Sequence, residues 1–175
     1  MLFCFNAGEV FQLAIDMEGN GIGFYEKAQK LIEDAEVKEL FSLLIQENRE
    51  HKRYFEELKA DLPGELVRPT VSDLDNELDA YLKAMADQHV FNDMDKLNAQ
   101  LAEARTVADA VKLALQCEKD CVIFYLSMLD ATCEGKARDL VNLLIKEKQE
   151  HVRRLSLQFQ KCSEVGNECL LSWPA

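Results

Sequence analysis

Residues 40–53, LFSLLIQENREHKR, recur as residues 140–153, LVNLLIKEKQEHVR, at an offset of 100 positions and without a gap. An earlier stretch repeats at the same offset, through the pairs Leu13/Leu113, Ala14/Ala114, Glu18/Glu118, Phe24/Phe124 and Tyr25/Tyr125. Chance similarity between amphipathic helices supplies shared leucines, but not Glu, Phe-Tyr, Glu-x-x-Glu-His and Arg in one register. The repeat therefore predicts two homologous helical hairpins, joined by a long crossover into an all-α, antiparallel four-helix bundle with an approximate two-fold axis.

Apolar residues spaced by three and four predict the helices of this bundle. The first follows an Asn6 cap to about Glu33, the second runs from about Val37 to Leu58, the third opens at Thr106, and the fourth runs from about Lys136 to Gln160. The crossover is expected at 61–105, with a loop, a short helix capped by Ser72 and a helical second half of the segment HVFNDMDKLNAQLAEAR. The bundle domain thus spans 1–163. The tail, 164–175, is expected to be irregular, with Trp173 anchored on the bundle or on a neighbouring subunit.

Length and composition favour a single soluble domain. The chain has 175 residues, of which 48% are hydrophobic, and this is enough to bury a core without disulfides. The formal net charge of -12 opposes binding to nucleic acid or to an anionic membrane. No apolar run reaches the roughly 18–20 residues that span a bilayer, and the opening MLFCFNAGEV lacks the features of a secretory signal. We therefore expect a cytoplasmic protein.

The six cysteines are expected to be free thiols, since no export signal directs the chain to an oxidising compartment. No Cys-x-x-Cys pair occurs, so the sequence encodes neither a rubredoxin-type iron site nor a zinc ribbon. Cys117 and Cys121, four apart on one helix, are typical of buried small apolar residues. Cys121 is the stronger candidate for a role at the site, because it lies on the inward stripe beside Glu118.

Two Glu–His pairs are predicted at one level inside the bundle. The midpoint between Glu18 and His51 falls at residues 34 and 35, where the first hairpin should turn. The midpoint between Glu118 and His151 falls at the second turn. Residues equidistant from the turn of an antiparallel hairpin lie at the same height. Carboxylates and imidazoles are costly to bury unpaired, so we expect either a metal ion or a hydrogen-bonded network among them.

Four segments around these residues resemble the four helices of the rubrerythrin family. EGNGIGFYEKA (18–28) and EKDCVIFYLSM (118–128) are similar to its first and third helices, and ENREHKRYF (47–55) and EKQEHVRRL (147–155) to its second and fourth. The resemblance covers nearly the whole chain and keeps the order of the elements. It implies a ferritin-like bundle that binds two irons and, in many members, reduces peroxide.

The sequence departs from the family pattern where bridging carboxylates are expected. The family motif is Glu-x-x-His, in which the Glu bridges both metals. Three positions before the two core histidines, this sequence has Asn48 and Lys148 instead. A further Glu that family members often carry, three residues after Glu118, is replaced by Cys121. A pair of divalent cations would therefore be much less well neutralised than in a regular member.

Three arrangements fit these residues. In the first, one metal ion is held by some of the four core residues with help from nearby donors. In the second, two ions bind because Glu47 and Glu147, four before each histidine, replace the lost bridges. In the third, no metal binds, Lys148 takes the metal's place beside a core glutamate, and Asn48 completes a hydrogen-bonded core. The expected metal ligands are Glu18, His51, Glu118, His151, Glu47 and Glu147, with Asn48, Lys148 and Cys121 as further site-lining residues.

Two classes of function follow. The resemblance implies a peroxidase-like non-haem iron oxidoreductase that acts on peroxide or dioxygen and is served by an electron donor protein. Two histidines with carboxylates suit one or two ions of Fe, with Mn or Zn as alternatives. The other class is a metal-free, ferritin-like structural or binding protein in which Lys148 replaces the metal charge. A homodimer is expected, because dimerisation is common for such folds.

Overall fold

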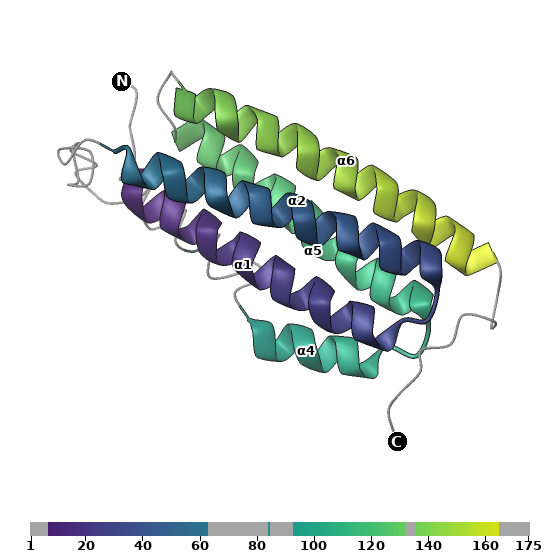
Figure 1. The fold of residues 1–175 in the computed structure, drawn as a ribbon. Helices are drawn as coiled ribbons and strands as arrows, with labels where there is room; N and C mark the ends of the chain where they lie inside the picture. Colours follow the sequence, from purple (N-terminus) through teal and green to yellow (C-terminus); the bar gives the residue numbers. More distant parts are fainter. Residues whose placement is uncertain (1–6, 63–83, 85–92, 132–135, 165–175) are drawn as a thin grey trace.

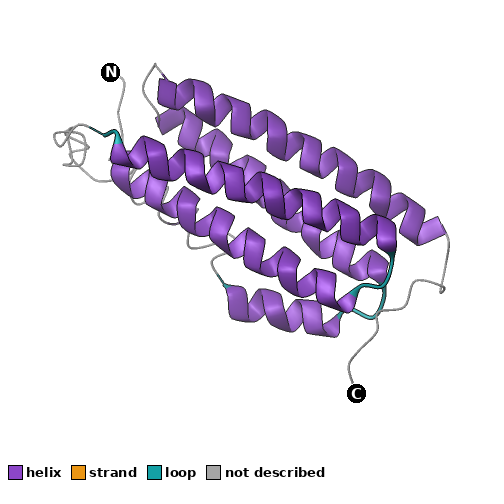
Figure 2. Cartoon of the chain, in the orientation of Figure 1, coloured by secondary structure: helices purple, strands orange, loops and turns teal. Residues whose placement is uncertain are grey.

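The computed structural model describes residues 7–62, 84, 93–131 and 136–164. Within these residues the regular structure is entirely α-helical (Figure 2). The helices are α1 (Ala7–Leu31), α2 (Ala35–Ala60), α4 (Met94–Glu103), α5 (Val107–Ala131) and α6 (Lys136–Glu164). None of them is both long enough and apolar enough to cross a membrane.

The four long helices form two antiparallel hairpins. α1 packs along α2, and α5 packs along α6; these are the most extensive helix contacts in the described chain. Figure 1 shows the four helices running along one long axis, with the short α4 against the outside of the bundle beside α1. The predicted ferritin-like bundle of two hairpins is therefore confirmed.

The sequence repeat is also a repeat of structure. α1 and α5 begin and end at positions that differ by 100, Ala7–Leu31 and Val107–Ala131. Equivalent positions of the two hairpins fill the core, as in the buried pairs Ala14/Ala114, Phe24/Phe124, Tyr25/Tyr125, Leu44/Leu144 and Ile45/Ile145. An approximate two-fold axis thus relates the two halves of the core.

Side-chain caps set the starts of α2 and α5, among other helices. The Asp34 carboxylate accepts a hydrogen bond from the Val37 amide at 2.9 Å and so caps α2. At the start of α5, Thr106 Oγ1 accepts from the Asp109 amide at 3.1 Å, and Asp109 Oδ2 accepts from the Thr106 amide at 3.0 Å. This reciprocal pair is a capping box, and it explains why the third long helix opens at Thr106 as predicted.

Helix boundaries differ from the sequence prediction by less than two turns. α1 ends at Leu31, slightly earlier than expected, whereas α6 continues past Gln160 to Glu164. The extension of α6 has a packing reason, because Cys162 is buried and keeps the last turn in contact with the core. α6 therefore ends at Glu164.

The crossover is described only in part. Its second half forms α4, as predicted, and buries Leu97 and Leu101. The expected Asn6 cap, the helix after Ser72 and the anchoring of Trp173 lie outside the described residues.

Candidate functional site

A buried polar network crosses the middle of the bundle. Its inner members are Glu18 from α1, Asn48 and His51 from α2, Glu118 from α5, and Lys148 and His151 from α6, none of them more than 2% exposed. Within the hairpins, His51 Nδ1 lies 3.6 Å from Glu18 Oε2, and His151 Nδ1 lies 3.2 Å from Glu118 Oε2. Counting residues from each hairpin turn predicts that these two Glu–His pairs face each other, and both pairs are present in the structure.

The Lys148 ammonium lies at the centre of the network. Nζ donates to Asn48 Oδ1 at 2.9 Å and to Glu18 Oε2 at 3.0 Å, and it lies 3.5 Å from Glu118 Oε2. One side chain of α6 therefore contacts all three other long helices. Burial alone would lower the pKa of Lys148, but the two carboxylates raise it well above its usual range. The amine is therefore a cation at neutral pH.

The two core glutamates are ionised partners of this cation. Burial would raise the pKa of Glu18, yet Lys148 and His51 together lower it to about 2. The pKa of Glu118 is also held well below its usual range, because Lys148, His151 and Tyr25 together outweigh the effect of burial. The centre of the bundle thus contains one fixed positive charge between two fixed negative charges.

Glu47 and Glu147 each reach the histidine of the opposite hairpin. Glu147 Oε2 lies 2.6 Å from His51 Nε2, and Glu47 Oε2 lies 2.9 Å from His151 Nε2. Both carboxylates are partly exposed, so they connect the buried imidazoles to the surface between α2 and α6. The sequence spacing places each glutamate on the same helix face as the histidine four residues later. It does not indicate that the carboxylate contacts the histidine of the other hairpin.

The two repeat-related tyrosines cross between the hairpins in the same way. Tyr25 donates its hydroxyl hydrogen to Glu118 Oε1 at 2.7 Å, and Tyr125 donates to Glu18 Oε1. The sequence places both tyrosines on the inner stripe, but it assigns no partner to their hydroxyl groups. Together with Lys148, these two bonds join the hairpins through charged acceptors.

Loss of one of these bonds should be measurable. Tyr125→Phe is expected to lower the free energy of unfolding by about 1.5–3 kcal/mol, the range for hydrogen bonds to charged groups. Tyr54→Phe is the matched control, because Tyr54 is half-buried on α2 and packs under Arg53 rather than into the network. Its effect should stay within about 0.5 kcal/mol. Urea unfolding of the two variants tests this, and equal losses would contradict a role for the Tyr125 hydroxyl.

Three buried polar atoms of the described residues lack a hydrogen-bond partner. They are Asn48 Nδ2, His51 Nδ1 and His151 Nε2. The last has an ion-pair distance to Glu47 but not the geometry of a hydrogen bond. Buried groups without a partner cost about 1–3 kcal/mol each. The network is therefore incompletely satisfied around the two histidines.

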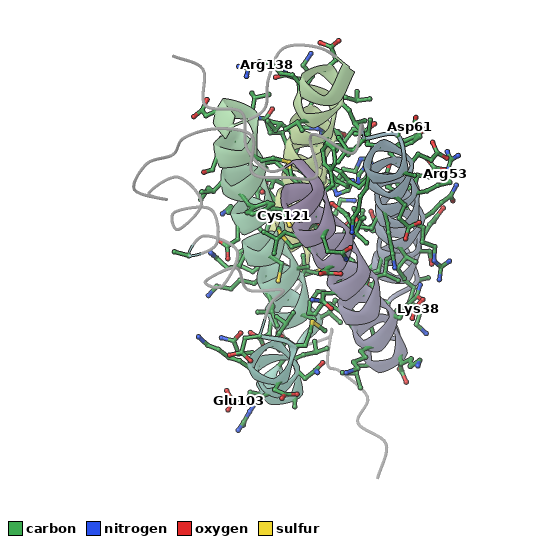
Figure 3. The ribbon with its side chains drawn as sticks, turned by 90° about the vertical axis from the view of Figure 1, so that its left-hand side faces the viewer. Lys38, Arg53, Asp61, Glu103, Cys121 and Arg138 are labelled. Atoms are coloured by element: carbon green, nitrogen blue, oxygen red, sulfur yellow. The ribbon has the colours of Figure 1, made fainter. Side chains whose placement is uncertain are left out.

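Two further residues lie against this network. Arg154 donates to both carboxylate oxygens of Glu47, at 3.1 and 3.2 Å. The sequence analysis did not identify Arg154. The one indication in the sequence is that the internal repeat is broken at this position, where the equivalent residue of the first hairpin is Tyr54. Cys121 lies inside the bundle (Figure 3), and burial raises the pKa of its thiol well above the usual range. The thiol is therefore neutral.

Family comparison identifies the chain. A model of the rubrerythrin family matches residues 9–158, which include nearly all of both hairpins and every member of the network. No curated protein and no solved structure matches significantly. The family match extends over most of the sequence and agrees with the two-hairpin bundle. The chain belongs to the rubrerythrin family.

Proposed function

We propose that this protein is a metal-independent member of its family, in which an internal ion network replaces the metal centre. It acts through its folded bundle, as a structural or binding protein, rather than as a peroxide reductase. The observation that carries this proposal is the position of the Lys148 ammonium, 3.0 Å from Glu18 and 3.5 Å from Glu118.

Members of this family generally bind iron, so the core residues have to be tested against a metal pair. Asn48 and Lys148 stand where bridging carboxylates are expected. The ammonium already neutralises the carboxylates that would otherwise attract metal ions, and a cation beside it would meet direct repulsion. Among the described residues, no three His, Cys, Asp or Glu side chains are placed to hold a metal ion. The residues present do not fit a metal pair.

A second candidate function is an oxidoreductase that acts on peroxide or dioxygen at bound Fe, Mn or Zn, with electrons from a donor protein. It is favoured by the way Glu18 and Glu118 converge with the Nδ1 atoms of His51 and His151. Carboxylate and imidazole are suitable donors for these ions. This function requires the Lys148 side chain to leave the centre of the network, which would cost the buried ion pairs that hold it.

We extend the proposal to a cytoplasmic homodimer. Buried free thiols at Cys117 and Cys121 are compatible with a reducing compartment. Leu43 and Leu143 are 40% and 48% exposed at equivalent positions of α2 and α6. A second copy covering these leucines would remove apolar surface from water.

Metal content is the direct test of the main proposal. Protein expressed with added iron and manganese and purified without oxygen is expected to contain no bound metal and to leave hydrogen peroxide unconsumed. A rubrerythrin-family protein with both bridging carboxylates, prepared in parallel, verifies that the conditions load iron. Elemental analysis showing two equivalents of iron in the present protein, together with peroxide turnover, would establish the second candidate instead.

A further inference from the structure

One helix face carries large apolar side chains in the second hairpin but not in the first. Ile123 and Leu126 of α5 are 53% and 45% exposed, and Ile123 is the most exposed large apolar side chain among the described residues. The equivalent positions of α1 are Gly23 and Glu26. Since the first hairpin folds in the same way without them, the bundle itself does not require apolar residues at these positions. Ile123 and Leu126 therefore suit a contact outside the subunit.

The two hairpins also differ beside these positions. In the first hairpin, Glu26 forms an ion pair with Arg49 of α2 at 2.7 Å, and both side chains are largely exposed. The repeat places Gln149 where Arg49 stands, so neither member of the equivalent pair is charged in the second hairpin. An ion-paired surface on one hairpin is thus replaced by an apolar surface at the equivalent place on the other. Loss of charged residues with gain of apolar ones is typical of the centre of a protein interface.

Charged residues of opposite sign lie at the two ends of this apolar pair. Lys119 comes four residues before Ile123, and Asp130 comes four residues after Leu126. All four side chains are exposed, and spacings of four, three and four residues place them on one face of a helix. Together they form the α5 stripe, with the order cation, apolar, apolar, anion.

The α5 stripe is complementary to itself when two copies of the helix run antiparallel. A two-fold axis between positions 124 and 125 brings Ile123 opposite Leu126 of the partner subunit, and Lys119 opposite Asp130 of the partner subunit. Each contact then occurs twice, as in any isologous interface. A parallel two-fold arrangement would instead bring each charge opposite its own copy. The order of charges therefore selects the antiparallel arrangement.

We propose that a second copy of this chain docks on the α5 stripe, with the two α5 helices antiparallel. This inference rests on the proposed homodimer and gives it an interface. It favours the α5 stripe over the surface at Leu43 and Leu143, because a carboxylate lies four residues before and four residues after each of those leucines. A second copy over that surface would bring acidic side chains together, whereas the α5 stripe pairs opposite charges.

Charge exchange tests the antiparallel register. Lys119→Glu and Asp130→Lys should each weaken dimerisation of the full chain by about 10-fold, because each places like charges opposite each other at two positions. The double variant Lys119→Glu/Asp130→Lys restores both pairs with reversed sign and should dimerise within about threefold of the wild type. Sedimentation velocity over a series of protein concentrations measures the dissociation constants. A double variant that dimerises no better than the weaker single variant would overturn the antiparallel α5 interface.

Leu126→Glu tests the apolar centre, with Leu143→Glu as the matched control on α6. The two leucines are exposed to a similar extent, 45% and 48%. Leu126→Glu should raise the dissociation constant of the dimer by at least about 30-fold, the effect of losing an interface hot spot. Leu143→Glu should leave this constant unchanged.

The two variants also separate failure of the interface from failure of the homodimer. A dimer that is dissociated by Leu143→Glu but not by Leu126→Glu would overturn the α5 interface and keep the homodimer. A wild-type protein that stays monomeric at every concentration would overturn the proposed homodimer itself, and the interface with it.

Discussion

Replacing Lys148 with methionine is expected to lower the free energy of unfolding at pH 7 by about 3–5 kcal/mol. Methionine has a similar length and fills the same space, but it leaves the ionised Glu18 and Glu118 without the cation between them. Removing one partner from a buried ion pair is strongly destabilising, because the remaining charges stay buried and uncompensated. Denaturant unfolding followed by circular dichroism, in the presence of a metal chelator, measures the loss.

Lys146→Met is the matched control, because Lys146 is exposed two residues earlier on α6. Its effect should lie within about 0.5 kcal/mol. Acidification provides a second check, since protonation of a core glutamate removes the uncompensated charge and should recover part of the stability of Lys148→Met. Equal losses in the two variants, or a loss in Lys148→Met that does not change with pH, would contradict a counter-ion role for Lys148.

The fold follows from the sequence because the repeat carries more information than either hairpin alone. One amphipathic pattern indicates a helix, but matching patterns at a fixed offset also indicate which helices are equivalent and where the turns lie. The heights of Glu18 and His51 follow from the same counting, since residues equally distant from a turn face each other. The structure places these two side chains 3.6 Å apart.

The choice among the three arrangements of the core could not be predicted in this way. Spacing assigns Lys148 to the inner stripe, but a long side chain there has several rotamers, and some direct the amine away from the centre. Which rotamer is adopted depends on the positions of Glu18, Asn48 and Glu118 on three other helices. Those positions are a property of the packed bundle, not of the α6 sequence.

The contacts between the hairpins were missed for a related reason. Periodicity gives the face of a residue within its own helix, and turn counting gives its height within its own hairpin. Neither specifies the lateral distance to the other hairpin. The bonds from Tyr125 to Glu18 and from Glu147 to His51 both cross that distance. These contacts depend on how the two hairpins pack against each other in the folded protein.

The wild-type protein is expected to lose stability steeply as the pH falls from about 4.5 towards 2. The network lowers the pKa of Glu18 from 4.5 to about 2 and holds that of Glu118 below its usual range. A carboxyl group whose pKa is lower in the folded protein binds protons preferentially in the unfolded chain. Its contribution is therefore complete above pH 4.5 and is lost as the pH falls through the folded value.

For Glu18 the shift corresponds to roughly 3 kcal/mol of stability, at 1.36 kcal/mol per pKa unit. Glu118 contributes with the same sign, but both carboxylates share Lys148, so the two contributions do not simply add. His151 acts in the opposite direction: burial lowers its pKa, but Glu118 raises it above 6.5. Its contribution is complete below pH 6.5 and declines as the pH rises through the folded value. The highest stability is therefore expected between about pH 5 and 6.5.

Urea unfolding measured from pH 3 to 8, at low and at high ionic strength, tests this dependence. Salt screens exposed ion pairs such as Arg153–Glu150 but hardly affects a buried pair. The loss of stability at acidic pH should therefore persist at high ionic strength. Lys148→Met supplies the decisive comparison, because without the ammonium its core carboxylates should bind protons more readily in the folded state than in the unfolded chain. As the pH falls from 7 to about 5, stability should then rise more in Lys148→Met than in the wild type, which regains the His151 contribution over this range. Parallel curves for the two proteins would mean that the acid sensitivity arises outside the buried network.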